Sequence, residues 1–282
     1  MYFGTREGLK KGEKKMSPNT IYYMPFDLLK AAELGTNRCK KFVVPAYLDL
    51  YNNSNNDGEC YYTLFWLLTR GGGFESPSGT YGQDIYRQLK EAVNFLQQKN
   101  LIGDIVDCKT GEVIDIMTAK PRDLLCFDVR NLYGYLKTRF ASISHEDYVK
   151  IKNIEYTERG FTFWKTLVMY MYISSCLKYN PRTNECAQQY WTFTAAHTYD
   201  DLCEGFTPTT VQSLFALLKE NKLIEYETTY IKDSPEKPPR CIGKVTILPM
   251  GDDQDRVEYR LQQAKKQARI DCIRYESNKL IV

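Results

Sequence analysis

Two stretches of the chain repeat one arrangement of apolar and polar positions at an offset of 122 residues. Each places apolar side chains three or four positions apart and then, after a charged spacer, an apolar pair. The matched positions are Leu89 and Val211, Val93 and Phe215, Leu96 and Leu218, and the pairs 101–102 and 223–224. Spacings of three and four predict the buried face of a helix, and the pair predicts entry into a strand. The repeat predicts two similarly folded units.

The segments around the two copies also correspond. An apolar stretch that predicts a helix precedes each copy (60–70 and 163–179), and a strand-like stretch precedes each of these (41–50 and 147–156). After the first copy, residues 102–117 alternate around Lys109, Thr110 and Gly111, which predicts a hairpin. After the second copy, two strand-like segments flank a charged, Pro-rich tip at 232–240, which predicts a longer hairpin.

The helix of the second copy has the clearer boundary signals. Thr207 predicts its N-cap, Pro208 its first residue, and Asn221 with Lys222 its end. In the first copy, the glycines within residues 71–85 disfavour a helix. We interpret "GGGFESPSG" as a flexible connector or a strand-forming insert. A phosphate-binding loop is the less favoured alternative, because no Lys follows the glycines as that motif requires.

Composition limits the classes of function. A chain of 282 residues with 43% hydrophobic and 26% charged residues is typical of a soluble globular protein of about two domains. The net charge of +3 is only mildly basic, so nucleic-acid binding would require a local concentration of positive charge. The most apolar stretch, 161–177, contains a lysine and predicts a core helix, so no membrane segment is expected.

Candidate chemistry is sparse. Nine scattered cysteines without a Cys-x-x-Cys pair, and only two histidines, predict no metal site and a reducing, cytoplasmic location. The chain opens without a secretory signal. Acidic residues are dispersed, and neither His145 nor His197 accompanies a nucleophile motif. We therefore expect no catalysis and no cofactor.

The second copy resembles the winged helix-turn-helix fold. Residues 198–205 are similar to the first helix of that motif, "FTPTTV" at 206–211 to its turn and recognition helix, and "LKENKLI" at 218–224 to the exit into the wing. Lys222 stands where glycine is usual, and Phe215 where leucine is usual. Two such units in tandem resemble the replication initiator and replisome-organiser proteins of plasmids and phages.

This resemblance implies an α+β, helix-rich fold of two tandem winged-helix domains with a C-terminal helix. The expected boundaries are an N-terminal tail and lead-in segment at 1–38, winged-helix domain 1 at 39–120, a helical linker at 121–146, winged-helix domain 2 at 147–250 and a basic C-terminal helix at 251–282. The tail is expected to be disordered.

The resemblance also implies which residues contact DNA. At the recognition helix of domain 2 they are Thr209, Thr210, Gln212 and Ser213, and around its hairpin they are Lys232, Lys237, Arg240 and Lys244. The corresponding residues of domain 1 are Arg87, Lys90, Asn94 and Lys109. Residues at the start of a recognition helix read base edges, whereas the hairpin cations position phosphates.

The resulting hypothesis is a protein that binds double-stranded DNA without catalysis, either as a replication initiator or as a related regulator of a mobile element. Two DNA-binding units in one chain would act as a monomeric pseudo-dimer or within a homodimer, with replication or regulatory proteins as further partners. The alternative hypothesis is a protein-interaction module that does not bind DNA, since the fold alone does not assign function.

Overall fold

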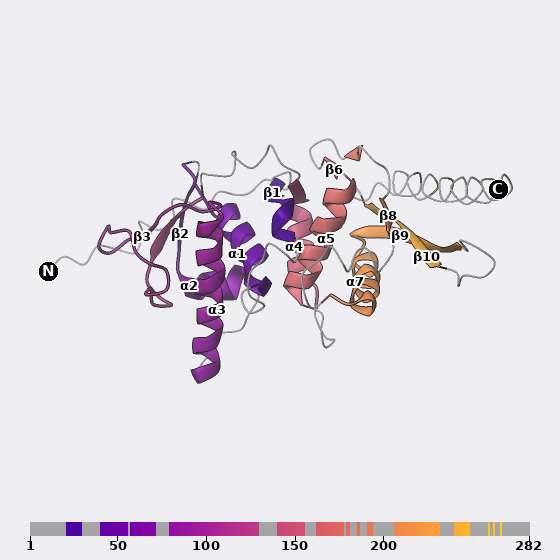
Figure 1. Cartoon of the computed structure of the whole chain (residues 1–282). Coiled ribbons are helices and arrows are strands. Elements are labelled where there is room, and N and C mark those ends of the chain that lie inside the picture. The colour runs from indigo at the N-terminus through magenta and orange to yellow at the C-terminus, as the bar shows by residue number, and fades with distance from the viewer. Residues whose placement is uncertain are drawn as a thin grey trace.

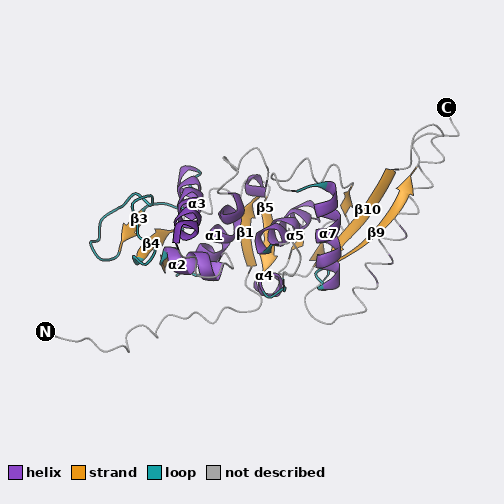
Figure 2. Ribbon diagram, turned by 90° about the horizontal axis from the view of Figure 1, so that it is seen from below, coloured by secondary structure: helices purple, strands orange, loops and turns teal. Residues whose placement is uncertain are grey.

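The computed structural model describes residues 21–29, 40–55, 57–71, 79–129, 140–155, 162–177, 179–180, 185–186, 191–193, 206–231 and 240–248, together with Tyr259, Gln262 and Lys266. These residues form a mixed, helix-rich α/β structure with small antiparallel sheets. The molecule is elongated, with one three-stranded sheet toward each end and helices between them (Figures 1 and 2).

The first half runs from helix α1 (Lys40–Asn52) through strand β2 (Glu59–Tyr62), the short helix α2 (Leu64–Trp66) and the π-helix η4 (Leu67–Gly71) to helix α3 (Gly79–Gln98). Strands β3 (Ile105–Asp107) and β4 (Leu125–Asp128) follow and join β2 in an antiparallel sheet of order β2-β4-β3. The predicted hairpin around Gly111 is confirmed, because Val106 bridges Val113 across it.

The described elements of the second half follow a related order, with an additional pair of short strands. Helix α5 (Phe163–Leu177) leads through the short strands β6 (Tyr179–Asn180), β7 (Glu185–Cys186) and β8 (Trp191–Phe193) to helix α7 (Pro208–Glu220). The predicted long hairpin is formed by β9 (Ile224–Ile231) and β10 (Arg240–Ile247), and the sheet order is β8-β10-β9. In both halves the strand that precedes the last helix lies beside the last strand of the sheet, β4 or β10.

A two-stranded sheet lies between the two halves. Strand β1 (Ile21–Pro25) pairs antiparallel with β5 (Phe140–Ser144), and the short 3-10 helix η2 (Phe26–Leu29) and helix α4 (His145–Lys152) continue from them. Tyr22 and Met24 of β1 are almost fully buried. Residues 21–29 of the lead-in segment therefore contribute to the core, and residues 1–20 and 30–38 of the expected tail and lead-in segment lie outside the described residues.

The apolar faces predicted for the repeat are confirmed. Leu89, Val93 and Leu96 of α3 are buried, as are Val211, Phe215 and Leu218 of α7, and they belong to one hydrophobic cluster that extends through both halves. Helix α7 begins as predicted: the Thr207 side chain accepts a hydrogen bond from the backbone N–H of Thr210, and Pro208 occupies the first turn.

Both helices of the repeat end in the same way. Asn100 and Lys222 have a φ of +55°, and the N–H groups of Leu101 and Leu223 each donate to a carbonyl five residues earlier, at 2.9 Å. The N–H groups of Asn100 and Lys222 each donate to a carbonyl three residues earlier, at 2.8 and 2.9 Å. This is the Schellman arrangement, in which a residue in the left-handed conformation closes the helix.

Two strand predictions are wrong, because the stretches 41–50 and 147–156 lie largely in α1 and α4. Helix α1 packs among α3, η4, α5 and β1 and is apolar on nearly all sides, so its sequence lacks a helical period. In α4 the alternation of Val149 and Ile151 with lysines is typical of a strand, but Ser144 caps a helix.

Three further predictions need correction. The stretch 60–70 begins as strand β2 and becomes helical only after Thr63, whose side chain caps α2. The glycines within residues 71–85 do not exclude a helix, since α3 begins at Gly79. Gly82 is buried, so packing against the core outweighs the low helix propensity of glycine. The linker at 121–146 contains β4 and β5 and, at its end, the start of α4, because Leu125 and Phe127 alternate with outward-facing side chains.

Two predicted elements cannot be compared with the structure in full. The expected first helix of the helix-turn-helix at 198–205 lies outside the described residues. Of the C-terminal segment 251–282, Tyr259, Gln262 and Lys266 are described, and all three are helical and exposed.

Candidate nucleic-acid interface

The outer face of α7 carries uncharged polar side chains at its beginning. Thr209 and Gln212 are exposed, and Ser213 is half-buried. Val211 and Leu214, which flank Gln212 and Ser213 in the sequence, are fully buried, so the rotation of the helix is fixed and the polar side chains point away from the core. No carboxylate occurs in α7 before Glu220. The start of this helix therefore has no charge that would repel a phosphate backbone.

Hydrogen bonding divides the four predicted residues of this helix into two kinds. The hydroxyl of Thr210 lies 3.0 Å from that of Thr207 and thus takes part in the cap. Within the described residues, no hydrogen bond engages the side chains of Thr209, Gln212 or Ser213. These three side chains thus form no hydrogen bond within the described part of the chain, whereas Thr210 stabilises the helix start.

The hairpin residues of the second half are described only in part. Lys232 and Lys237 lie outside the described residues. Arg240 is the first residue of β10, opposite Ile231, and Lys244 pairs with Glu227 further along the ribbon. Arg240 therefore marks the end of β10 at the hairpin tip.

In the first half, two of the predicted cations already have partners within the protein. The Arg87 guanidinium forms an ion pair with Asp84, one helical turn earlier, and both side chains are about half exposed. The Lys90 ammonium donates a hydrogen bond to the carbonyl of Met117 at 2.9 Å, and burial lowers the pKa of Lys90. Lys90 therefore fastens α3 to the loop that follows β3.

The remaining residues of the first half lie in a more acidic setting. Asn94 is half-buried and shares the face of Arg87 and Lys90, while Lys109 is exposed in the hairpin turn. Acidic residues outnumber basic ones between positions 104 and 123: Asp104, Asp107, Glu112, Asp115 and Asp123 against Lys109, Lys120 and Arg122. This hairpin is less suited to a polyanion than the face of α7. Helices α3 and α7 are also separated by α1, α4 and α5 (Figure 1).

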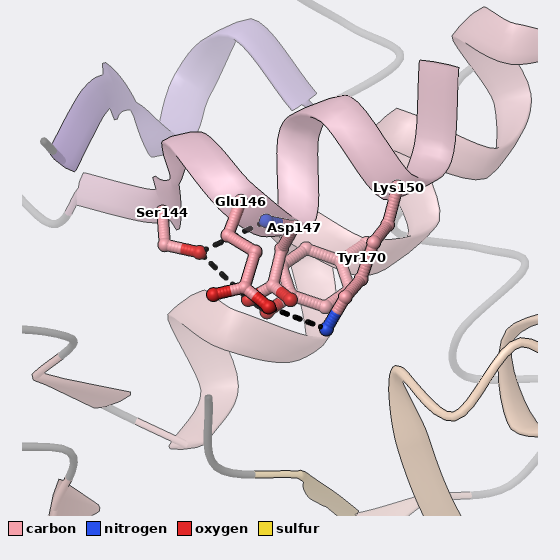
Figure 3. A network of polar contacts seen from close by, with 5 residues as sticks. All are labelled: Ser144, Glu146, Asp147, Lys150 and Tyr170. Carbon is pink, nitrogen blue, oxygen red and sulfur yellow. Dashed lines mark hydrogen bonds and ion pairs between the residues drawn. The ribbon is translucent and has the colours of Figure 1, made fainter. Parts of the chain in front are cut away.

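A buried polar network beside β5 was not predicted from the sequence. Ser144 caps α4: its hydroxyl accepts from the Asp147 N–H at 3.0 Å and donates to Asp147 Oδ2 at 2.9 Å. The Tyr170 hydroxyl of α5 donates to the same oxygen at 2.8 Å (Figure 3). Burial raises the pKa of Asp147, and the bonds from Tyr170 and Ser144 oppose that rise. The network fastens α4 to α5, and the Ser-x-x-Asp spacing is its only local signal.

Metal and membrane features were sought across the described ranges. Those residues contain no cluster of three or more His, Cys, Asp or Glu side chains that could hold a metal ion. None of the described helices is both long and apolar enough to cross a bilayer.

Comparison with known proteins adds no family to these observations. A scan against protein-family models finds no matching family, and a search of curated proteins finds no significant match.

Proposed function

We propose that the chain is a duplex DNA-binding protein built from two tandem winged-helix units, with α7 as the principal recognition helix. The order of elements supports this fold. In the first half, α1, β2, α2 with η4, α3, β3 and β4 follow the helix, strand, helix, helix, strand, strand order of a winged helix. The corresponding elements of the second half are α5, β8, α7, β9 and β10, with the same sheet order.

The outer face of α7 is the observation that carries the functional proposal. Its apolar side is buried in the core, and its opposite side presents Thr209, Gln212 and Ser213, whose side chains form no hydrogen bond to any residue that the structure describes. In the major groove, a glutamine can pair bidentately with adenine, and hydroxyl groups can serve either hydrogen-bonding role. Helix N–H groups at the start of α7 favour a nearby phosphate.

We assign to the protein a non-catalytic role as a replication initiator or a related regulator of a mobile element, acting in the cytoplasm. This role rests on the resemblance of the tandem arrangement to such proteins. Because α3 and α7 lie in different halves, one chain would present two DNA-binding surfaces, as a pseudo-dimer does.

A protein-interaction module is the second candidate function. The acidic excess around the first hairpin and the Arg87–Asp84 ion pair favour it for the first half. In that case α3 and its hairpin contact another protein, and the chain does not change the electrophoretic mobility of duplex DNA even at low salt.

Selection of duplex fragments from a genomic pool with the full-length protein tests the proposal. We expect one enriched sequence, and an affinity that falls steeply as salt rises, because phosphate contacts release counterions. Gln212→Ala should weaken binding to the enriched site by about 1–3 kcal/mol and relax the preference at one base pair. Gln98→Ala, the same truncation at an exposed position at the C-terminal end of α3, is the matched surface control. A pool that yields no enriched fragment and no shift at low salt favours the protein-interaction module.

A further inference from the structure

A cluster of aromatic and charged side chains lies where α1, β2, η4 and α4 meet. Trp66 is 39% exposed, and the guanidinium carbon of Arg70 lies 5.4 Å from the centroid of its ring. The Tyr62 ring packs edge-on against Trp66 with centroids 6.0 Å apart, and its hydroxyl donates a hydrogen bond to Asp49. We refer to Trp66, Arg70, Tyr62, Asp49 and Lys152 as the Trp66 cluster.

Two cations of the Trp66 cluster share one carboxylate. Lys152 and Arg70 both interact electrostatically with Asp49, and they repel each other. Asp49 is only 3% exposed, whereas Arg70 is exposed and Lys152 is half-buried. The buried Asp49 carboxylate therefore compensates one of the two positive charges. The accessible surface of the cluster keeps a net positive charge, which attracts an anion.

The floor of the cluster has unused hydrogen-bonding groups. Asp49 Oδ2 and the Tyr148 hydroxyl are buried and have no hydrogen-bond partner among the described residues. The Asp49 carboxylate also interacts electrostatically with the Tyr148 hydroxyl. Buried polar atoms are nearly always bonded to protein or to a bound molecule. Arg70 also belongs to a π-helix, a distortion that is frequent at functional sites.

We propose that the Trp66 cluster binds a nucleotide unit, with the base stacked on Trp66 and the phosphate held by Arg70 and Lys152. An exposed indole offers a stacking surface to any base, and arginine and lysine match the charge of a phosphate. The nucleotide is either free or part of a single strand, because a base inside a duplex is already stacked. The site uses neither α3 nor α7, so it is independent of duplex binding by α7.

Fluorescence anisotropy of a labelled thymidylate oligomer of about 12 nucleotides tests the site in the full-length protein. We expect Trp66→Ala to weaken binding about 5- to 150-fold and Trp66→Phe to restore most of it, because a phenyl ring also stacks. Arg70→Ala should weaken binding and lower its salt dependence by about one phosphate contact. Trp164→Phe is the matched control, since Trp164 packs against Phe206 in the other half, with ring centroids 5.7 Å apart.

Competition and cross-linking complete the experiment. Displacement of the oligomer by thymidine monophosphate assigns the site to free nucleotides, and resistance to it assigns the site to single strands; both outcomes support the proposal. Photo-cross-linking of a 5-iodouracil oligomer should label the peptide that contains Trp66. Equal binding by wild type and Trp66→Ala, or no binding of oligomer or monophosphate at low salt, overturns it. The Gln212→Ala variant separates this site from the proposed function. It should lose duplex binding and still bind the single-stranded oligomer as the wild type does.

Discussion

Lys222 and Asn100 adopt the same left-handed backbone conformation at matching points of the repeat, each with a φ of +55°. In this conformation any Cβ approaches the backbone too closely, but asparagine tolerates it better than lysine because its short polar side chain can hydrogen-bond locally. Lys222 therefore occupies a position that favours glycine.

Replacement of Lys222 should make the protein more stable. We expect Lys222→Gly to raise the free energy of unfolding by about 0.5–1 kcal/mol, because relief of the left-handed strain exceeds the added entropy of the unfolded chain. Ala216→Gly, at an exposed site within α7, is the control and should lower the free energy by about 1 kcal/mol. Urea denaturation measures both variants, and a loss of stability in Lys222→Gly contradicts the expectation.

Asp49 should make stability depend on pH. Burial raises its pKa from 3.8 to about 6, although Lys152, Tyr62 and Arg70 oppose that rise. The folded state thus binds the proton more tightly than the unfolded chain, so the contribution of this group to stability is largest below the unfolded pKa and declines as pH rises through the folded one.

The matched variant for this titration is Asp49→Asn, which cannot ionise. The free energy of unfolding of the wild type minus that of the variant should fall by about 2–2.5 kcal/mol between about pH 4 and pH 7. Urea denaturation at several pH values gives this difference. A difference that does not change with pH would show that Asp49 ionises as freely in the folded protein as in the unfolded chain.

At the scale of elements, local signals predicted those parts of the structure that have one apolar and one polar side. Helix α7 has a regular apolar period and the cap residues Thr207 and Pro208, so its bounds and its outer face followed from the sequence. Helix α1 did not, because neighbours surround it and Pro45 lies within it. The Asp147–Tyr170 bond joins residues 23 positions apart, and the Trp66 cluster joins α1 to α4, so no local pattern reveals either of them.

The attachment of α4 to α5 depends on the hydrogen bond between Tyr170 and Asp147. Tyr170→Phe should lower the free energy of unfolding by about 1.5–3 kcal/mol, because the bond reaches a buried carboxylate. Tyr47→Phe is the control, since the buried Tyr47 hydroxyl has no partner among the described residues, and its removal should be neutral or stabilising. Equal losses in thermal denaturation would assign the effect to the loss of any buried hydroxyl.

At the scale of the whole molecule, the two halves share the strand order of their three-stranded sheets but differ in surface charge. The face of α7 is uncharged at its start, whereas α3 has its Arg87 in an ion pair and its Lys90 bound to Met117. We therefore expect the halves to contribute unequally to DNA affinity.

Paired variants measure this inequality. Gln212→Ala should reduce affinity for the selected duplex by a factor of about 5 or more, whereas Arg87→Ala should change it by less than about twofold, because its charge is already compensated. Binding titrations at a fixed salt concentration, with circular dichroism to check folding, compare the two variants. A larger loss in Arg87→Ala assigns base contacts to α3 instead.

The pairing of β1 with β5 makes the order of synthesis matter. Ile21 faces Ser144 and Pro25 faces Phe140, so the strand made first has its partner more than a hundred residues later. Until that part of the chain leaves the ribosome, β1 lacks its partner strand and Tyr22 lacks the Tyr148 ring that packs edge-on against it, although Tyr22 and Met24 are buried in the finished protein. A nascent chain stalled before residue 140 should therefore expose these apolar side chains to chaperones, and release beyond residue 144 should end that exposure.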